Sequence, residues 1–347
     1  MKIRNFIDDA IKVIKDTVNP SKEEKIDLKQ LIYNEIEEHD SIIIARHVRP
    51  DGDCIGSAFG LREVLTASFP NKKIYCVGDG VPEYLSYLGE EDNVNDELYS
   101  ESLVIVVDTA TGNRIACEKY KEAKKLIKID HHISVDNYAE INYVIEESPA
   151  CCQIIADFVK TFEEKLVMTK FAAKCLYTGL VTDTGRFRFR SVDANTMRIA
   201  AYLLDKKIDT EQIYTNLGVK SPESFKLQGY IYQNFKVTQS GVAYAYITKK
   251  LMKKFNASVE DASNLVNCLD SIKGSLIWIL FVEYDNEIRV RLRSRYIPVV
   301  GIGEQFNGGG HANACGATLA KEKDIKTLLD VADKQLAQFK EENKELF

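Results

Sequence analysis

The sequence predicts an α/β protein that has a parallel-sheet N-terminal domain and a smaller α+β C-terminal domain. Two observations predict this class. After residue 40, short apolar strands alternate with amphipathic helices, which is the order of elements that builds a parallel sheet. After residue 234, strand patterns dominate, and one long helix ends the chain. The chain of 347 residues is long enough for two such domains at about 100–200 residues each.

The first domain is predicted to contain buried strands, because several short runs are apolar almost throughout. These runs span residues 41–47, 72–78, 102–108 and 125–130. Segments with helical spacing of apolar residues lie between and after them. The predicted helices span residues 55–69, 82–88, 114–124, 150–162, 170–183 and 194–204. This alternation predicts a sheet that helices cover on both faces.

The second domain is predicted to be rich in strands. Its strands span residues 235–239, 242–248, 275–284 and 287–295, and its helices span residues 259–269 and 324–344. The N-terminus is predicted to form two short helices with a break at Pro20. The predicted boundaries are an N-terminal helical extension at 1–38, a first domain at 39–205, a helical linker at 206–234 and a second domain at 235–347.

The composition excludes several classes of protein. No apolar run approaches the ~20 residues that a bilayer span needs, and the charged N-terminus does not resemble a secretory signal. The net charge of −6 removes the global basic field of many nucleic-acid-binding proteins, so local cations would have to hold an anionic substrate. None of the eight cysteines forms a C-x-x-C pair. We therefore expect buried thiols in a reducing compartment, the cytoplasm, and no membrane partner.

The first candidate site directly follows a predicted strand. It has the sequence R-H-V-R-P-D-G-D and contains His47, Asp51 and Asp53. Open α/β sheets bind ligands at the C-terminal ends of their strands. A single aspartate before a helix is commonly a cap, which is the alternative reading here. One histidine and two aspartates so close together favour a metal site over that alternative.

Further acids end other predicted elements. Asp108 ends an apolar strand, Asp130 ends the next strand and precedes His131 and His132, and Asp183 ends an apolar helix. Each one alone could be a cap or a surface acid. Together they predict a rim of carboxylates and imidazoles that suits Mn²⁺ or Mg²⁺, and a set without thiolates argues against structural zinc. Carboxylates that bridge two ions ~3.5–4 Å apart form a clamp for displacement at phosphate esters.

The second domain carries a glycine-rich turn and a row of arginines. The glycines precede His311, where a helix start would direct the positive end of a dipole at an anion. The arginines alternate with apolar residues at Arg289, Arg291, Arg293 and Arg295. Period two puts them on one face of a strand, either as a solvated face or for recognition of phosphates. A second alternating set, at Arg186, Arg188 and Arg190, is open between surface alternation and substrate contact.

These motifs together resemble the DHH phosphoesterase superfamily, in its group of two-domain nano-RNases and pAp phosphatases. Asp130-His131-His132 matches the motif that names the family, and the residues from His47 to Asp53 match H-x-x-x-D-x-D. The strand-end Asp108 and the T-D-T-G-x-F stretch from Thr182 match two further motifs. The R-S-R run and the GGGH turn match the DHH-associated C-terminal domain, so the resemblance covers about residues 40–340. The chain departs from the pattern at Ala150-Cys151-Cys152, where small hydroxyl residues are expected to open a helix.

The resemblance implies a role for each matched residue. One metal ion would be held by His47, Asp51 and Asp108, and a second by Asp53, Asp108, His131 and Asp183, with Asp108 bridging. The catalytic residues would be Asp53, Asp108 and His132, the last of which would contact the scissile phosphate. The substrate-binding residues would be Arg293, Ser294, Arg295, Gly308, Gly309, Gly310 and His311. The implied cofactors are two divalent ions, Mn²⁺ foremost with Mg²⁺ or Co²⁺ as substitutes, and a cleft between the two domains would hold the substrate.

The same resemblance implies a hydrolase that cleaves P–O3′ bonds of very short oligonucleotides to 5′-mononucleotides. It also implies removal of the 3′-phosphate from adenosine 3′,5′-bisphosphate. Short oligonucleotides and nucleotide bisphosphates are therefore the expected partners, together with a second copy of the chain in a homodimer. A cyclic or linear dinucleotide phosphodiesterase is the nearest alternative, and an RNA-binding protein without activity is the alternative from another class. The complete set of metal-site residues argues for an active enzyme.

Overall fold

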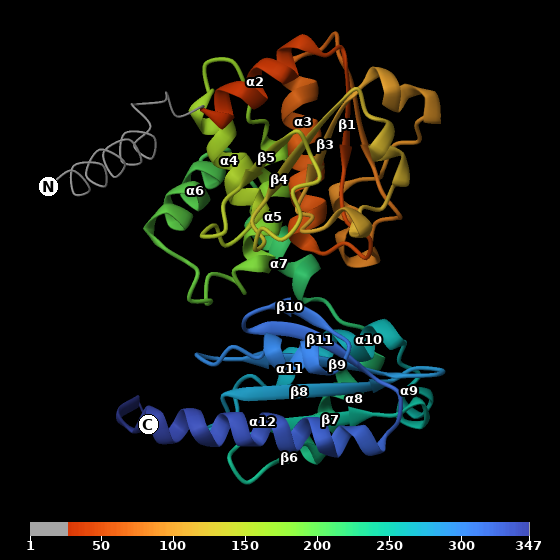
Figure 1. Cartoon of the computed structure of the whole chain (residues 1–347), viewed down its shortest axis with the longest axis vertical. Helices are drawn as coiled ribbons and strands as arrows, with labels where there is room; N and C mark the ends of the chain where they lie inside the picture. Colours follow the sequence, from red (N-terminus) through yellow and green to blue (C-terminus); the bar gives the residue numbers. More distant parts are fainter. Residues whose placement is uncertain (1–26, 347) are drawn as a thin grey trace, which may run out of the picture. The chain divides into compact units, whose positions relative to one another are not determined.

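The computed structural model describes residues 27–346, and the chain divides into two compact units, Met1–Leu217 and Gly218–Phe347 (Figure 1). The division falls inside the segment that was predicted as a helical linker. This segment holds the helices α7 (Thr210–Gly218) and α8 (Pro222–Asn234). The helix predicted before Pro20 lies outside the described residues. No helix in the described part of the chain is both long enough and apolar enough to cross a membrane.

The first unit is built on a five-stranded parallel sheet with the order β2-β1-β3-β4-β5 (Figure 1). Its strands are β1 (Ser41–Ala45), β2 (Lys73–Val77), β3 (Leu103–Val107), β4 (Lys125–Asp130) and β5 (Ile141–Val144). β1 and β3 are buried throughout, as expected for central strands covered on both faces. β1, β3 and β4 are neighbours, so their C-terminal ends lie side by side. β5 was not predicted, because four residues give too short a pattern.

Long helices cover one face of this sheet. They are α2 (Leu28–Glu38), α3 (Gly52–Ser68), α4 (Cys151–Thr161), α5 (Lys170–Asp183) and α6 (Ala194–Leu204). α3 and α5 pack with their backbones in close approach, because a Cβ at Gly56 would lie only 2.5 Å from the carbonyl oxygen of Cys175. A Cβ at Gly52 would lie 2.5 Å from Thr182 Oγ1. The glycines therefore bring the start of α3 against the end of α5, where two of the predicted site acids stand.

The opposite face is covered by short 3₁₀ turns and loops. The turns are η2 (Asp96–Glu101), η3 (Gly112–Arg114) and η4 (Glu118–Glu122). A further 3₁₀ turn, η1 (Glu83–Leu88), packs against α3 on the helical face. The helix predicted at 114–124 is therefore wrong, and the one predicted at 82–88 is a 3₁₀ turn. The backbone near Ile115 pairs with the loop after β1 instead, since Val48 N–H donates to Arg114 O and Ala116 N–H donates to Arg46 O. This pairing is incompatible with helix and ties the segment to the loop that carries His47.

The second unit has a six-stranded mixed sheet with the order β10-β11-β9-β8-β7-β6. Its strands are β6 (Lys236–Val237), β7 (Ala243–Ile247), β8 (Ile277–Glu283), β9 (Ile288–Ser294), β10 (Gly309–His311) and β11 (Ala314–Leu319). One face packs on α8, α9 (Lys249–Phe255), α10 (Val259–Ser263) and η5 (Asn264–Leu269). The other face packs on α11 (Val300–Gln305) and α12 (Lys323–Glu342). The fold class is the predicted one, a parallel α/β unit followed by a smaller α+β unit.

Two local predictions in these units are wrong, and the arginine set left open after Asp183 is not part of a strand. No helix begins at His311, because that residue ends β10 in a hairpin with β11. The helix predicted at 259–269 is divided into α10 and η5. The arginines after Asp183 lie in a turn rather than in an alternating strand, with Arg186 and Phe187 both at a φ of 60°. A left-handed conformation at two consecutive residues interrupts any period-two pattern.

Candidate metal centre

The candidate centre lies at the C-terminal ends of three adjacent strands of the first unit. These ends, with the start of α3 and the end of α5, carry His47, Asp53, Asp108, Asp130, His131, His132 and Asp183. All of these side chains are buried or half-buried. Because the strands are parallel and adjacent, their terminal residues meet at one edge of the sheet, the usual ligand edge of an open α/β fold.

Asp108 lies between two imidazoles. Its Oδ2 is 3.4 Å from His47 Nε2, and its Oδ1 is 3.4 Å from His131 Nε2. The residue is 2% exposed, and Oδ1 accepts no hydrogen bond among the described residues. The backbone of Asp108 has a φ of 50°, a left-handed conformation that aspartate tolerates better than most residues. Each carboxylate oxygen thus faces a different histidine.

These separations fit divalent ions. Two ligand atoms that each lie ~2.1 Å from one ion are about 3.0–3.4 Å apart at octahedral to tetrahedral angles. His131 Nε2 also lies 3.4 Å from Asp183 Oδ2 and 3.8 Å from Asp53 Oδ2. Ligand atoms of Asp53, His131 and Asp183 therefore form one compact group, and those of His47, Cys54 and Asp108 form another. The first group holds three of the four residues predicted for one ion, without Asp108. The second holds His47 and Asp108 of the set predicted for the other ion, with Cys54 in place of Asp51.

Crowding and burial shift the pKa values of the acids in the centre. Burial, followed by the charge of Asp108, raises the pKa of Asp53 to about 7. Burial and the charge of Asp53 also raise the pKa of Asp183 well above its usual range. Burial opposes the ionisation of Asp108 as well, but the adjacent imidazoles of His131 and His47 keep its pKa below the usual range. Carboxylates crowded in this way are all ionised at once only when positive charge lies among them. A divalent ion would supply that charge and would displace the protons from these oxygens.

Asp53 has a second task. Its Oδ2 accepts a hydrogen bond from the N–H of Cys151 at 2.6 Å, and its Oδ1 accepts one from the N–H of Cys152 at 2.9 Å. The carboxylate therefore caps the start of α4 and stands where the helix dipole is positive. The hydroxyl residues expected at this position are not needed for that contact, because backbone N–H groups supply it.

Asp51 is the N-cap of α3. Its Oδ1 accepts hydrogen bonds from the N–H groups of Asp53 and Cys54, both at 3.1 Å. The residue is exposed, and it belongs to neither compact ligand group. The cap explains one of its oxygens, and its role as a metal ligand remains a proposal.

Some residues of the centre could not be found by motif alone. Cys54 lies in a ligand group, and its only signal in the sequence is its position next to Asp53. Arg46 is fully buried, forms ion pairs with Asp79 and Glu91, and donates to the carbonyl oxygen of His47 at 2.9 Å. The sequence around Arg46 gives no indication of these partners, because they lie in loops far along the chain. Arg46 holds the loop that presents His47.

The arginine row of the second unit forms as predicted over three of its four members. In β9, arginines alternate with the buried Val290 and Leu292, at Arg289, Arg291 and Arg293. Arg295 follows the end of the strand, with its guanidinium 5.5 Å from the centre of the Trp278 ring. Burial, followed by the charge of Arg291, lowers the pKa of Arg293 to about 10. An anion beside Arg293 would stabilise its charge.

The glycine turn lies next to the arginine row. His311 pairs with Ala314, and Ala314 pairs with Arg293 on the other side, so the three align across β10, β11 and β9. A Cβ at Gly308 would lie 1.9 Å from the carbonyl oxygen of Gly316, so glycine is required for this close approach. Ser294, in contrast, points to the buried face, where its hydroxyl donates to Ile297 O. The structure thus aligns Arg293 with the turn, whereas the Ser294 hydroxyl lies on the buried face against Ile297 and Asn313.

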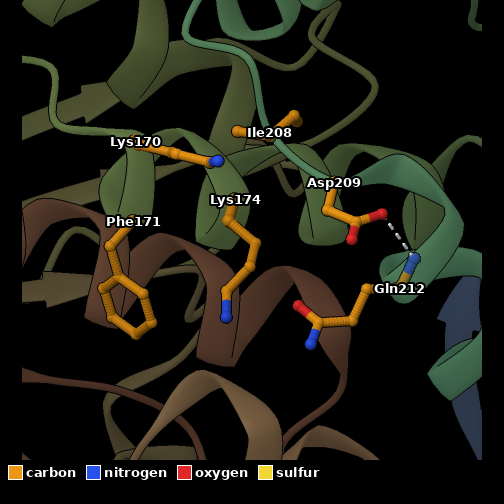
Figure 2. A pocket seen from close by; sticks show the side chains of 6 residues that line it. All are labelled: Lys170, Phe171, Lys174, Ile208, Asp209 and Gln212. Atoms are coloured by element: carbon orange, nitrogen blue, oxygen red, sulfur yellow. Dashed lines mark hydrogen bonds between the residues drawn. The ribbon is translucent and has the colours of Figure 1, made fainter.

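A separate depression of about 380 Å³ lies at the start of α5 (Figure 2). Its lining residues are Lys170, Phe171, Lys174, Ile208, Asp209 and Gln212. Asp209 accepts a hydrogen bond from the N–H of Gln212, and Lys174 donates to Tyr87 O. Lys170 and Asp183 stand at the two ends of α5, thirteen residue steps or about 20 Å apart at the α-helical rise. The depression is therefore not part of the candidate centre.

Comparison with known proteins identifies the family. Residues 41–180 match the DHH family, N-terminal domain, and residues 239–338 match the DHHA1 domain. The chain is 36% identical over 293 residues to the bifunctional oligoribonuclease and PAP phosphatase NrnA of Bacillus subtilis, a match that covers 84% of this chain and 93% of the relative. This chain belongs to the DHH family of phosphoesterases. The predicted family is confirmed.

Two more relatives support the same assignment of this DHH protein. The probable bifunctional oligoribonuclease and PAP phosphatase NrnA of Streptococcus mutans is 37% identical over 298 residues, covering 85% of this chain and 95% of the relative. Among solved structures, an exopolyphosphatase-related protein from Bacteroides fragilis matches with a TM-score of 0.80 and 27% identity, over 90% of this chain and 96% of that one. DHH phosphoesterases are metal-dependent hydrolases, and the centre described above contains this chain's candidate metal ligands.

Proposed function

We propose that this DHH protein is a two-metal phosphoesterase that hydrolyses P–O3′ bonds of very short oligonucleotides to 5′-mononucleotides. We further propose that it removes the 3′-phosphate of adenosine 3′,5′-bisphosphate. The observation that carries the proposal is Asp108, whose two oxygens each lie 3.4 Å from a different imidazole. The names of the Bacillus subtilis and Streptococcus mutans relatives support the choice of substrates.

We assign the site residues to two ions that would share Asp108. His47, Asp51 and Asp108 would hold one ion, and Asp53, Asp108, His131 and Asp183 would hold the other. Oxygen and imidazole ligands favour Mn²⁺, with Mg²⁺ and Co²⁺ as substitutes. When bound, such a pair supplies an acidified water and neutralises the charge of the phosphate. His132, which Asp130 orients, would contact the scissile phosphate.

The DHHA1 domain would hold the part of the substrate that does not react. We assign the 5′-phosphate to Arg293, Arg295 and the turn at Gly308–His311. The alignment of His311 with Arg293 supports this assignment. Both reactions break a P–O3′ bond next to a nucleotide that carries a 5′-phosphate, so one anchor would serve both.

Two further proposals concern the setting of the enzyme. The eight cysteines are free thiols, which supports the reducing cytoplasm as its compartment. A homodimer is proposed on the family resemblance alone, and sedimentation of the purified protein tests it.

Turnover of three substrates tests the function. A 5′-labelled RNA dimer, adenosine 3′,5′-bisphosphate and a cyclic dinucleotide are each incubated with the Mn²⁺-loaded protein, with and without excess chelator. We expect 5′-mononucleotides from the first two substrates, and no product after chelation. Preferential turnover of the cyclic dinucleotide would instead identify a dinucleotide phosphodiesterase. Binding of the RNA dimer without cleavage would identify an RNA-binding protein.

A further inference from the structure

Lys128 is a fully buried cation beside the candidate centre, on β4 two residues before Asp130. A buried ammonium group needs partners for its charge and its donors. Its Nζ donates to Ala110 O at 2.9 Å and to Asp136 O at 3.1 Å, and it lies 3.3 Å from Asp130 Oδ2. Lys128 thus connects the loop after Asp108, the loop after the DHH motif and the first residue of that motif.

Asp130 contacts a different partner at each oxygen: among the described residues, an ion pair without a hydrogen bond at Oδ2, and hydrogen bonds at Oδ1. While Oδ2 faces Lys128, Oδ1 accepts hydrogen bonds from the N–H of His131 at 2.9 Å and from His132 Nδ1 at 2.7 Å. An ionised carboxylate only accepts, so His132 Nδ1 carries the proton in this contact. In the proposed function, the ring nitrogen left to contact a substrate phosphate would therefore be Nε2. Lys128, Asp130 and His132 form a chain of contacts from the interior of the sheet to the centre.

We propose that Lys128 is a positioning residue for His132 and acts through Asp130. The inference rests on the proposed function, in which His132 contacts the scissile phosphate. The ammonium group fixes the carboxylate from behind, so that Oδ1 is aimed at Nδ1 and the imidazole is held in one tautomer and one orientation. Lys128 has no hydrogen bond or ion pair described above with the two compact ligand groups. Its ion-pair partner Asp130 belongs to a further group with Asp108 and His132.

A purely structural role is the competing explanation. Lys128 also ties down two loops through Ala110 and Asp136, and its Nζ lies 5.0 Å from the centre of the Tyr138 ring. A lysine that only supports the loops would affect stability and all functions of the centre alike. A lysine that acts through Asp130 would affect what depends on His132 and little else. A double-mutant cycle separates these two roles.

Lys128→Met removes the charge and keeps an unbranched side chain of similar length. We expect it to lower kcat on the RNA dimer about 10–100-fold, the range for residues that orient catalytic ligands, with KM little changed. In a His132→Ala background, the same substitution should change kcat about twofold or less, because the group it positions is gone. Equal losses in both backgrounds would overturn the proposal.

Two variants control this cycle. Tyr138→Phe removes the hydroxyl that donates to Thr109 O at 2.9 Å and keeps the ring beside Lys128. We expect it to lower Tm while kcat stays within about twofold of the wild type, because Asp130 is untouched. If Lys128→Met does not fold, Asp130→Asn takes its place in the cycle, since it has the same shape and removes the carboxylate that links Lys128 to His132. Additive losses of Asp130→Asn and His132→Ala would then overturn the proposal.

Imidazole NMR tests the positioning without substrate. Nitrogen–proton correlation spectra of the metal-free protein give the tautomer of each histidine, and the His132 signal is identified by its loss in His132→Ala. We expect a single Nδ1–H form of His132 in the wild type and a mixture of forms in Lys128→Met. An unchanged His132 signal in that variant would overturn the inference. Absence of turnover by the wild-type protein would instead overturn only the proposed function.

Discussion

At the scale of single residues, Asp108 is the centre of the proposed site. It combines a left-handed backbone at a φ of 50° with a buried carboxylate that faces two imidazoles. Backbone strain of this kind persists where the surrounding structure enforces it, and it is common at functional sites. Asparagine has the same shape as aspartate and also tolerates this conformation.

Asp108→Asn should therefore fold normally and lose its activity. Loss of the charged bridging ligand removes the two-metal geometry, and we expect kcat on the RNA dimer to fall more than ~10³-fold. Far-UV circular dichroism and Tm of the metal-free protein serve as controls for the fold. A folded variant with a near-normal rate would show that Asp108 is not shared between ions.

The raised pKa values of Asp53 and Asp183 predict how stability depends on pH. Folding raises the pKa of Asp53 to about 7, so the folded state binds its proton more tightly than the unfolded state does. The stability from this group is complete at pH values below ~4 and is lost as pH rises toward 7. Asp183 acts in the same direction. The Tm of the metal-free wild type should therefore fall over this range relative to Asp183→Asn, and Mn²⁺ should restore it. A parallel pH dependence of the two proteins would contradict this.

The sequence identified the chemistry of these residues better than their environment. The positions of Asp108, His131 and Asp183 at element ends were sufficient to predict one rim, because parallel strands align their C-terminal ends. The cap that Asp53 provides to α4 was not predictable, since its N–H donors lie in Cys151 and Cys152, far along the chain. The ion pairs of Arg46 have the same origin.

At the scale of elements, glycines bring α3 and α5 together. A Cβ at Gly56 would meet the backbone oxygen of Cys175 at 2.5 Å, whereas a Cβ at Gly60 would meet the side chain of Leu176 at 2.6 Å. A side chain can move more cheaply than a backbone can. This packing sets the distance between Asp53 at one helix start and Asp183 at the other helix end.

Gly56→Ala should thus lower the free energy of unfolding more than Gly60→Ala does. We expect Gly56→Ala to destabilise the protein by roughly 1–3 kcal/mol and to weaken Mn²⁺ binding, because the helices separate. Chemical denaturation and metal titration measure the two effects. Gly229→Ala in α8, where no atom lies within 4 Å of the new Cβ, is the control and should stabilise the protein by about 0.5–1 kcal/mol. Equal stability of Gly56→Ala and Gly60→Ala would contradict the packing argument.

Helices and strands were predictable where the apolar pattern was long. They were less predictable where pairing with a distant segment determined the local structure. α5 and α6 match their predicted bounds, because each carries a continuous helical pattern ended by polar residues. The helix prediction at residues 114–116 was wrong, because their backbone pairs with the loop after β1. The helix start predicted at His311 was wrong for a related reason, since His311 pairs with β11 in a hairpin. Local sequence does not encode such partners.

At the scale of the whole molecule, we propose that one domain carries out catalysis and the other binds the substrate. The DHH domain would carry the metal ions, and the DHHA1 domain would hold the 5′-phosphate of the substrate. Arg293→Ala should lower kcat/KM on 5′-phosphorylated dimers about 10²–10³-fold, as for a lost charge-assisted pair. Arg293→Lys should retain only part of the wild-type kcat/KM on these dimers, because an ammonium group lacks the planar guanidinium fork. Dimers without a 5′-phosphate should already be poor substrates and lose little more. Equal losses on both kinds of dimer would show that Arg293 is not the anchor.

The central claim is that two ions share Asp108, and electron paramagnetic resonance of the Mn²⁺-loaded protein tests it most directly. Ions ~3.5–4 Å apart on a common carboxylate are magnetically coupled. The wild type with two equivalents of Mn²⁺ should show the spectrum of a coupled pair, and Asp108→Asn should show only isolated ions. A wild-type spectrum of isolated Mn²⁺ alone, or saturation at one ion per chain, would contradict the account.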